Sequence, residues 1–325
     1  MTDIVFAINA TAPIVLMVVV GYFLKKIGLI DCSIAKALNK LVFKVFLPAM
    51  LFLNMYKIES FSDVNFNFVW YTIIATVILF AIALPVVCLM TKENPKRGAL
   101  IQSVFRANYA LVGIPLATSL FGEAGGIMAT VLSAFIIPIF NTLAVIGLCV
   151  FSSGKKPSVK KILVGIVKNP LIQSIALGFV VLGIRAIFVK FGVSFRLADV
   201  QPVYKTLSNL SSVATPLALL VLGAQFELSA IPELKRYITF GVVTRNLIVP
   251  VLGLGVAYLL GVFNGAQFAT FVAVFCTPVA VSSVPMAQEM DADVSLAGQL
   301  VIWSTVFSTF SIFLASYIFK ALGVF

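Results

Sequence analysis

An all-α membrane protein with ten transmembrane helices is the fold that this sequence predicts, on three observations. Of its 325 residues, 61% are hydrophobic and 11% are charged, whereas a soluble domain carries about 25% charged residues. Apolar stretches of about 20 residues, the length that crosses the hydrocarbon of a bilayer, recur between short polar segments. Prolines recur in the same order in the two halves of the chain. Since lipid offers backbone groups no hydrogen-bond partner, the apolar stretches are expected to be helices.

The ten expected spans are bounded by charged or turn-rich breaks. The first has no basic segment before it and is followed by Lys25 and Lys26, which is typical of a retained helix rather than a signal peptide. The spans are residues 4–24, 34–55, 66–90, 98–120, 125–151, 169–190, 203–225, 236–260, 266–288 and 294–319.

Lysine and arginine gather in alternate connections, after the first, third, fifth and seventh spans. The positive-inside rule places these connections in the cytoplasm, so both termini are expected outside a multi-pass protein of the plasma membrane. One connection disagrees, because four basic residues surround the sixth, which this topology places outside: Arg185, Lys190, Arg196 and Lys205.

The two halves are expected to be inverted repeats, since a duplicated unit of five crossings must reverse its direction. Val104, Phe105, Ala110, Pro115 and Ala117 recur 170 positions later as the same residue types. The predicted organisation is a first five-helix repeat over residues 1–151, a short basic cytoplasmic linker over 152–168 and a second, inverted repeat over 169–325. Paired prolines stand in other corresponding spans: Pro13 with Pro170, Pro48 with Pro216, and Pro85 with Pro250.

The fourth span is expected to be broken. Pro115 has no backbone N–H and clashes with the carbonyl four residues back, so we expect the helix to open near Leu111. Gly113 permits the backbone to bend there and a ligand to approach closely. Interrupted helices at the interface of two repeats are where transporters of this kind bind substrate.

The ninth span is the second candidate for a broken helix, with Pro278 next to Ser282 and Ser283. Open backbone at membrane depth is tolerated only against protein or a wet cavity. A half-helix that restarts after a break offers free N–H groups and a positive dipole end, which suit an anion.

Two arginines, Arg106 and Arg245, fall well within spans, where a cation is costly unless it meets a partner or a cavity. For Arg106, extension of the side chain to the cytoplasm is an equal alternative to a place in the pocket. All 12 acidic residues lie at span ends or in loops. The two unpaired cations therefore favour an anionic ligand, and the coupling of its transport to protons, to sodium or to voltage alone stays open.

Several other classes of protein are excluded by composition. The chain has no histidine, and its four cysteines stand far apart, so no metal site, cofactor or Ser-His or Cys-His catalytic pair is predicted. An enzyme is therefore not expected. The net charge of +11 indicates basic residues that orient the helices in the membrane rather than a surface that binds nucleic acid, because most of these residues lie in short loops.

Five short motifs resemble the auxin efflux carrier family along nearly the whole chain. The motif NYALVGIPL at 108–116, followed by Phe121-Gly122, is similar to the fourth-helix signature of that family, which includes plant auxin exporters and bacterial malate or malonate permeases. In many relatives an asparagine stands near the position of Ser282. The other motifs are LPA at 47–49, KNPL at 168–171, ATPLALL at 214–220 and TPVAVSS at 277–283.

The resemblance implies two inverted five-helix repeats, related to bile-acid symporters, whose fourth and ninth helices cross at the substrate site. It implies that Asn108 and Pro115, with Pro278, Ser282 and Ser283, line the pocket, and that the third to fifth and eighth to tenth helices slide against the rest.

The function expected from sequence is a secondary carrier of a small organic anion, such as malate, malonate or an auxin-like indole carboxylate. Membrane lipid and a second copy of the chain are the other expected partners. An anion channel and a ligand sensor without flux are the alternatives that the sequence leaves open. The expected substrate-binding residues are Arg106, Asn108, Gly113, Pro115, Arg245, Pro278, Ser282 and Ser283.

Overall fold

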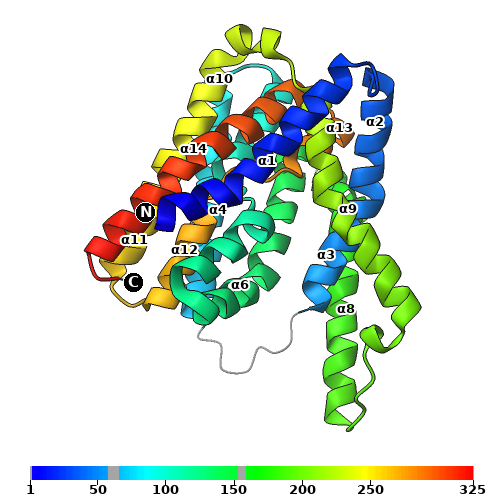
Figure 1. Ribbon diagram of the computed structural model, residues 1–325, viewed down its shortest axis with the longest axis vertical. Helices are drawn as coiled ribbons and strands as arrows, with labels where there is room; N and C mark the ends of the chain where they lie inside the picture. Colours follow the sequence, from blue (N-terminus) through cyan, green and yellow to red (C-terminus); the bar gives the residue numbers. More distant parts are fainter. Residues whose placement is uncertain (1, 58–65, 153–158, 325) are drawn as a thin grey trace.

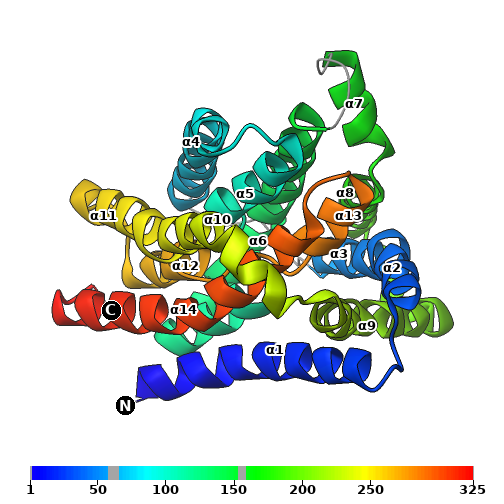
Figure 2. The same ribbon diagram turned by 90° about the horizontal axis from the view of Figure 1, so that it is seen from above.

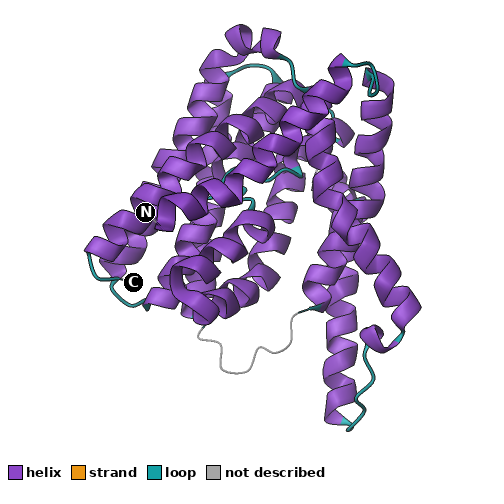
Figure 3. Cartoon of the chain, viewed as in Figure 1, coloured by secondary structure: helices purple, strands orange, loops and turns teal. Residues whose placement is uncertain are grey.

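The protein is a bundle of helices in a computed structural model that describes residues 2–57, 66–152 and 159–324 (Figure 1). Within those ranges no strand is present, and the irregular segments are short (Figure 3). The first half contains α1 (Thr2–Lys26), α2 (Cys32–Leu41), η1 (Val42–Phe46), α3 (Leu47–Tyr56), α4 (Asn67–Met90), α5 (Asn94–Phe105), η2 (Tyr109–Gly113) and α6 (Ile114–Val150). The second half contains α7 (Val159–Lys168), α8 (Pro170–Lys190), η3 (Leu197–Asp199), α9 (Gln201–Gln225), η4 (Leu228–Ala230), α10 (Ile231–Val243), η5 (Thr244–Ile248), α11 (Val249–Leu260), α12 (Gly265–Phe275), α13 (Ser283–Glu289) and α14 (Val294–Ala321).

Seven helical segments of the described chain are long and apolar enough to cross a membrane, which confirms a multi-pass membrane protein. One of them, Tyr109–Val150, passes through the expected boundary between the fourth and fifth spans. Two helices meet at that boundary, because Phe121 and Gly122 leave helical geometry, Gly122 with a φ of +60°, and a Cβ atom added at Gly125 would lie 2.3 Å from the carbonyl oxygen of Ala117. The other six are Cys32–Tyr56, Asn67–Met90, Pro170–Lys190, Gln201–Gln225, Leu228–Leu260 and Val294–Ala321.

The helices form two groups on either side of a central crossing. The first group contains α2, α3, α8 and α9, which pack on one another at one side of the molecule (Figure 1). The second contains α4, α5, α6, α10, α11, α12 and α14 (Figure 2). Helix α1 joins them, since it contacts α9 of the first group and α14 of the second.

Two glycines allow α1 and α9 to meet backbone to backbone. A Cβ atom added at Gly21 would lie 2.0 Å from the carbonyl oxygen of Leu220, and one at Gly223 would lie 2.0 Å from that of Val18. Small residues at helix interfaces are typical of membrane proteins, because packing rather than hydrophobicity drives helices together in lipid. This close approach fixes α1 on the first group.

Three prolines follow the same wide turn. The π-helical turns η1, η2 and η5 each end two residues before a proline, at Pro48, Pro115 and Pro250. The residue before each proline donates its N–H to the carbonyl five residues back, as Ile114 does to Tyr109. The wider turn accommodates the missing N–H and the ring of proline without a sharp break.

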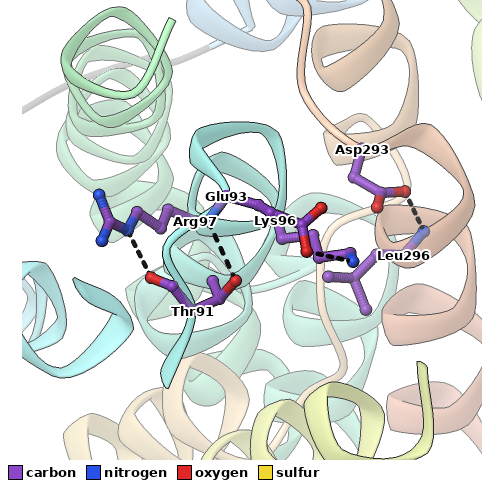
Figure 4. A network of polar contacts seen from close by, with 6 residues as sticks. All are labelled: Thr91, Glu93, Lys96, Arg97, Asp293 and Leu296. Atoms are coloured by element: carbon purple, nitrogen blue, oxygen red, sulfur yellow. Dashed lines mark hydrogen bonds and ion pairs between the residues drawn. The ribbon is translucent and has the colours of Figure 1, made fainter. Parts of the chain in front are cut away.

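The loop between α4 and α5 is closed by a local polar network (Figure 4). Arg97 Nε donates to the carbonyl of Thr91 at 2.7 Å, and Lys96 Nζ lies 2.7 Å from Glu93 Oε1. The same loop meets the start of α14, where Asp293 caps the helix with a 2.9 Å bond from the N–H of Leu296. The hydrogen bond to Glu93 raises the pKa of Lys96. In the predicted linker, α7 packs against α6 and α8, and residues 153–158 lie outside the described chain.

Candidate functional site

Two interrupted helices cross at the centre of the bundle. The fourth helix is interrupted over residues 106–108, between α5 and η2, and the ninth over residues 276–282, between α12 and α13. The two extended segments pair as an antiparallel bridge of Ala107 with Val279. Asn108 donates its N–H to the carbonyl of Pro278 at 2.8 Å, and Ala280 donates to that of Arg106 at 3.3 Å.

The break in the fourth helix lies earlier than Leu111, where Pro115 alone would place it. The difference arises because η2 accommodates Pro115 by widening, so the chain resumes a helical path at Tyr109. The helix then leaves the N–H groups of its first turn, including those of Ala110 and Leu111, without acceptors inside the helix.

Arg245 stabilises the broken end of α12. Its Nε donates to the carbonyl of Thr277 at 2.8 Å and its Nη2 to that of Val274 at 2.6 Å, and the side chain is buried. The N–H of Val279 is satisfied by Ser304 Oγ at 3.0 Å. A cation at a helix C-terminus complements both the free carbonyls and the dipole. The structure therefore gives Arg245 backbone contacts rather than a place in a cavity wall.

A cavity of about 130 Å³ lies beside the crossing. It lies between the two groups of helices, since α3 and α9 supply one wall and the interrupted helices the other. Its lining is Leu47, Met50, Asn54, Asn108, Ala110, Leu111, Thr215, Ala218, Val281 and Ser282.

Larger hollows lie elsewhere in the described chain, between α10 and α14 with a volume of about 450 Å³, between α4 and α11 with about 410 Å³ and between α11 and α14 with about 240 Å³. Their walls are chiefly apolar and include exposed side chains such as Phe310 and Leu252. These are surfaces that lipid chains would cover. We therefore take the smaller and more polar cavity, which we call the crossing cavity, as the candidate binding site.

Asn108 has a free donor in the crossing cavity. The residue is 8% exposed, and its side-chain Nδ2 has no hydrogen-bond partner. Its backbone is fully used, because the N–H bonds Pro278 and the carbonyl accepts from Val112 and Gly113 at 3.0 and 3.4 Å. A buried unsatisfied amide costs free energy unless a ligand or water completes it. The backbone bonds thus hold in place a side chain that lines the cavity and whose buried donor is unpaired.

Arg106 lies directly behind the cavity wall. The residue is 2% exposed, so its guanidinium lies inside the bundle and does not reach the cytoplasmic surface. Nη2 donates to Ser282 Oγ and to Asn141 Oδ1, each at 2.9 Å. Nη1 donates to Gln102 Oε1 at 2.7 Å and contacts the sulfur of Met286 at 2.9 Å. All of these partners are neutral.

Ser282 connects that charge to the cavity. Its oxygen accepts from Arg106 and it lines the cavity, so its own hydroxyl proton can be donated to a bound molecule. Ser283 is buried instead and lies 3.5 Å from Arg106 Nη1. Of the two serines, Ser282 is the one that the structure places in the wall.

The remaining sequence-predicted residues shape the crossing without lining the cavity. Gly113 packs tightly, because an added Cβ would lie 2.7 Å from the ring of Tyr109 and 3.0 Å from the carbonyl oxygen of Ala273. Pro115 lies in the first turn of α6, and Pro278 contributes its backbone carbonyl to Asn108.

Asn54 and Thr215, on the opposite wall, were not among the predicted site residues. Thr215 lies within the motif ATPLALL at 214–220, and its hydroxyl contacts the sulfur of Met50 at 3.8 Å. Polar residues next to Pro216 and near the end of the second span were the available signal. Sequence alone did not place these helices against the crossing.

The fold and the crossing cavity define a multi-pass membrane protein of the transporter class. The sequence profile of the membrane transport protein family matches residues 6–316, and the chain belongs to this family of auxin efflux carrier-like proteins. It is similar to an uncharacterized transporter of Methanothermobacter thermautotrophicus, with 24% identity over 317 residues that cover 92% of this chain and 94% of the relative. A second uncharacterized transporter, from Methanocaldococcus jannaschii, is 25% identical over 305 residues, covering 91% and 93%. Both names indicate a transporter rather than an enzyme.

Proposed function

We propose that this protein is a secondary carrier of a small organic anion, which it binds in the crossing cavity and moves by alternating access. The observation that carries the proposal is a small cavity between two groups of helices in which a buried amide donor, Asn108, has no partner. Ser282, on the same wall, has a hydroxyl proton to donate, and Arg106 supplies positive charge behind it. Hydrogen-bond donors and a nearby positive charge stabilise a bound carboxylate.

The proposed architecture is ten crossings in two inverted repeats, over residues 1–151 and 169–325, joined by the linker at 152–168. In this assignment α5, η2 and the first part of α6 form the fourth crossing, and α12 with α13 forms the ninth. Each repeat then has its break in the corresponding helix, and the two breaks pair with each other. The proximity of the two chain ends in Figures 1 and 2 agrees with an even number of crossings.

The proposed motion is a sliding of the second group of helices past the first, in the manner of an elevator. Both groups line the cavity, so their relative displacement would change the side of the membrane to which it opens. Polar contacts join the first group to α13, which packs on α14 of the second: Gln288 Oε1 on α13 accepts from Asn39 on α2 at 2.8 Å and from Gln225 on α9 at 2.9 Å. Hydrogen bonds can be exchanged during such a motion more readily than a packed apolar interface.

The proposed orientation places the basic connections in the cytoplasm and both termini outside the plasma membrane. Cysteines introduced at exposed loop positions, labelled by a membrane-impermeant thiol reagent in intact cells, test it. Before this experiment Cys32 and Cys88, which are exposed, should be replaced by serine. Labelling at Lys92→Cys, in the exposed connection between α4 and α5, in intact cells would contradict the orientation.

Counterflow in proteoliposomes tests the function. Labelled malate, malonate and indole-3-acetate are offered separately to vesicles that contain wild-type protein or Asn108→Ala. Asn209→Ala is the matched control, since Asn209 is an exposed asparagine on α9. Saturable exchange of at least one anion, lost in Asn108→Ala and kept in Asn209→Ala, would support the carrier. Currents far above the rate of a carrier would instead indicate a channel, and binding without exchange would indicate a sensor.

A further inference from the structure

We propose that the crossing cavity selects by charge, binding a small monoanion and rejecting the dianion of the same size, and that Arg106 sets this preference. The inference rests on the proposed function and specifies the substrate class of the same site. It concerns a residue behind the cavity wall, so Arg106 acts as a specificity-determining residue rather than as a wall residue.

In the described part of the chain, Arg106 is the cation that hydrogen-bonds to the wall of the cavity, whereas Arg245 bonds to backbone carbonyls at the end of α12. No residue of the cavity lining is charged. Arg106 is connected to this lining by one hydrogen bond, which its Nη2 donates to Ser282 Oγ at 2.9 Å. Its contacts are with Gln102, Asn141, Ser282, Ser283 and Met286, all of them neutral. Neither of the two ion pairs found in the described part of the chain includes it.

A buried cation without a counter-ion is costly, and the cost falls when an anion is bound next to it. One negative charge in the crossing cavity completes a neutral pair with Arg106. A second negative charge meets no further cation in the described lining of the cavity and would be desolvated without compensation there. The site therefore favours a ligand with one charge over a ligand of equal shape with two.

The hydrogen-bond donors that line the cavity agree with a ligand that carries one carboxylate. Asn108 Nδ2 and the Ser282 hydroxyl can serve the two oxygens of one carboxylate. The opposite wall offers Leu47, Met50 and Ala218, with the neutral polar groups of Asn54 and Thr215. These groups can serve a hydroxyl, a carbonyl or a protonated carboxyl at the other end of the ligand, and neither is hydrogen-bonded to a cation as Ser282 is to Arg106.

Malonate and its monoamide, malonamate, form a pair of nearly equal size that differs by one charge. Inhibition of labelled-substrate counterflow by each compound should be measured between pH 6 and pH 8 in proteoliposomes. We expect malonamate to inhibit equally across this range. Malonate should weaken by about tenfold per pH unit above its second pKa, because its monoprotonated fraction falls tenfold per unit.

Variants of Arg106 assign the preference to this residue. Arg106→Lys keeps the charge and should keep the preference for malonamate over the dianion. Arg106→Gln removes the charge and should abolish that preference, so that neutral malonamide inhibits as well as malonamate. Arg245→Lys is the matched control, since Arg245 is also buried but contacts only backbone carbonyls in the structure, and its preference should equal that of the wild type. The midpoint of thermal unfolding of each purified variant, measured without ligand, shows that the variant is folded.

Three results would overturn the proposal. Inhibition by malonate that does not weaken between pH 6 and pH 8 would show that the dianion is accepted, while the carrier function itself would stand. An unchanged preference in folded Arg106→Gln would assign selectivity to another group. Absence of exchange or inhibition with every anion, in folded wild-type protein, would refute the proposed function and this inference with it.

Discussion

Replacement of Asn108 by alanine tests whether this residue binds substrate or stabilises the fold, because its side-chain Nδ2 has no hydrogen-bond partner within the protein. Its Nδ2 is buried and has no hydrogen-bond partner, which costs free energy in the folded protein. Truncation removes this cost, and it also removes some favourable packing. We expect the free energy of unfolding to change by less than about 1 kcal/mol. A hydrogen bond to a charged ligand contributes about 1.5–3 kcal/mol. Affinity for the substrate anion should therefore fall by about 10- to 150-fold.

The assay combines thermal unfolding of purified protein with ligand binding on the same sample. Asn141→Ala is the contrasting variant, since Asn141 Oδ1 accepts from Arg106 at 2.9 Å and its Nδ2 donates to Ile137 at 2.9 Å. Its removal deprives a buried guanidinium of an acceptor and should cost about 1–3 kcal/mol of stability. The reasoning would be refuted if Asn108→Ala lowered stability as much as Asn141→Ala and left the affinity unchanged.

Three further predictions concern the frame around the site. Arg245→Leu leaves the carbonyls at the end of α12 without donors and should cost about 2 kcal/mol or more, measured as a lower unfolding midpoint, with Arg245→Lys less affected. Gly223→Val places a side chain against the Val18 carbonyl and should prevent the contact between α1 and α9, which size-exclusion chromatography would detect as a loss of folded protein. Gly255→Val is the control and should be tolerated, because a Cβ atom there meets open space. A disulfide in the double variant Asn39→Cys and Gln288→Cys should stop exchange reversibly with reductant; undiminished exchange after complete cross-linking would argue against the sliding motion.

The interrupted helices could be predicted from sequence because their signals are local. Proline and glycine in the fourth span and Pro278 in the ninth mark positions where a regular helix cannot continue. The break at residues 106–108 was placed one turn too late, since the π-helical turn before Pro115 is a response of the backbone that composition does not encode. The helices α5, α12 and α13 are each too short to cross a bilayer alone, and they overlap the spans 98–120 and 266–288 that hydropathy predicts.

The partners of the two buried arginines could not be predicted. In the sequence both Arg106 and Arg245 are cations inside a span without a carboxylate partner, and only for Arg106 is extension to the cytoplasm an alternative. Their roles differ because Arg245 reaches the carbonyls at the end of α12, while Arg106 reaches side chains on α6 and next to α13. Such contacts depend on which helices cross, and this is a property of the tertiary fold. The same holds for Asn54 and Thr215, which reach the cavity from the other group of helices.

The most direct test of the central claim is counterflow of a labelled small carboxylate in proteoliposomes, compared between wild-type protein, Asn108→Ala and Asn209→Ala. Our account predicts saturable exchange in wild type and Asn209→Ala, and a loss of at least about tenfold in the apparent affinity of Asn108→Ala. Exchange that is equal in all three folded proteins would contradict a binding site at the crossing of the fourth and ninth helices.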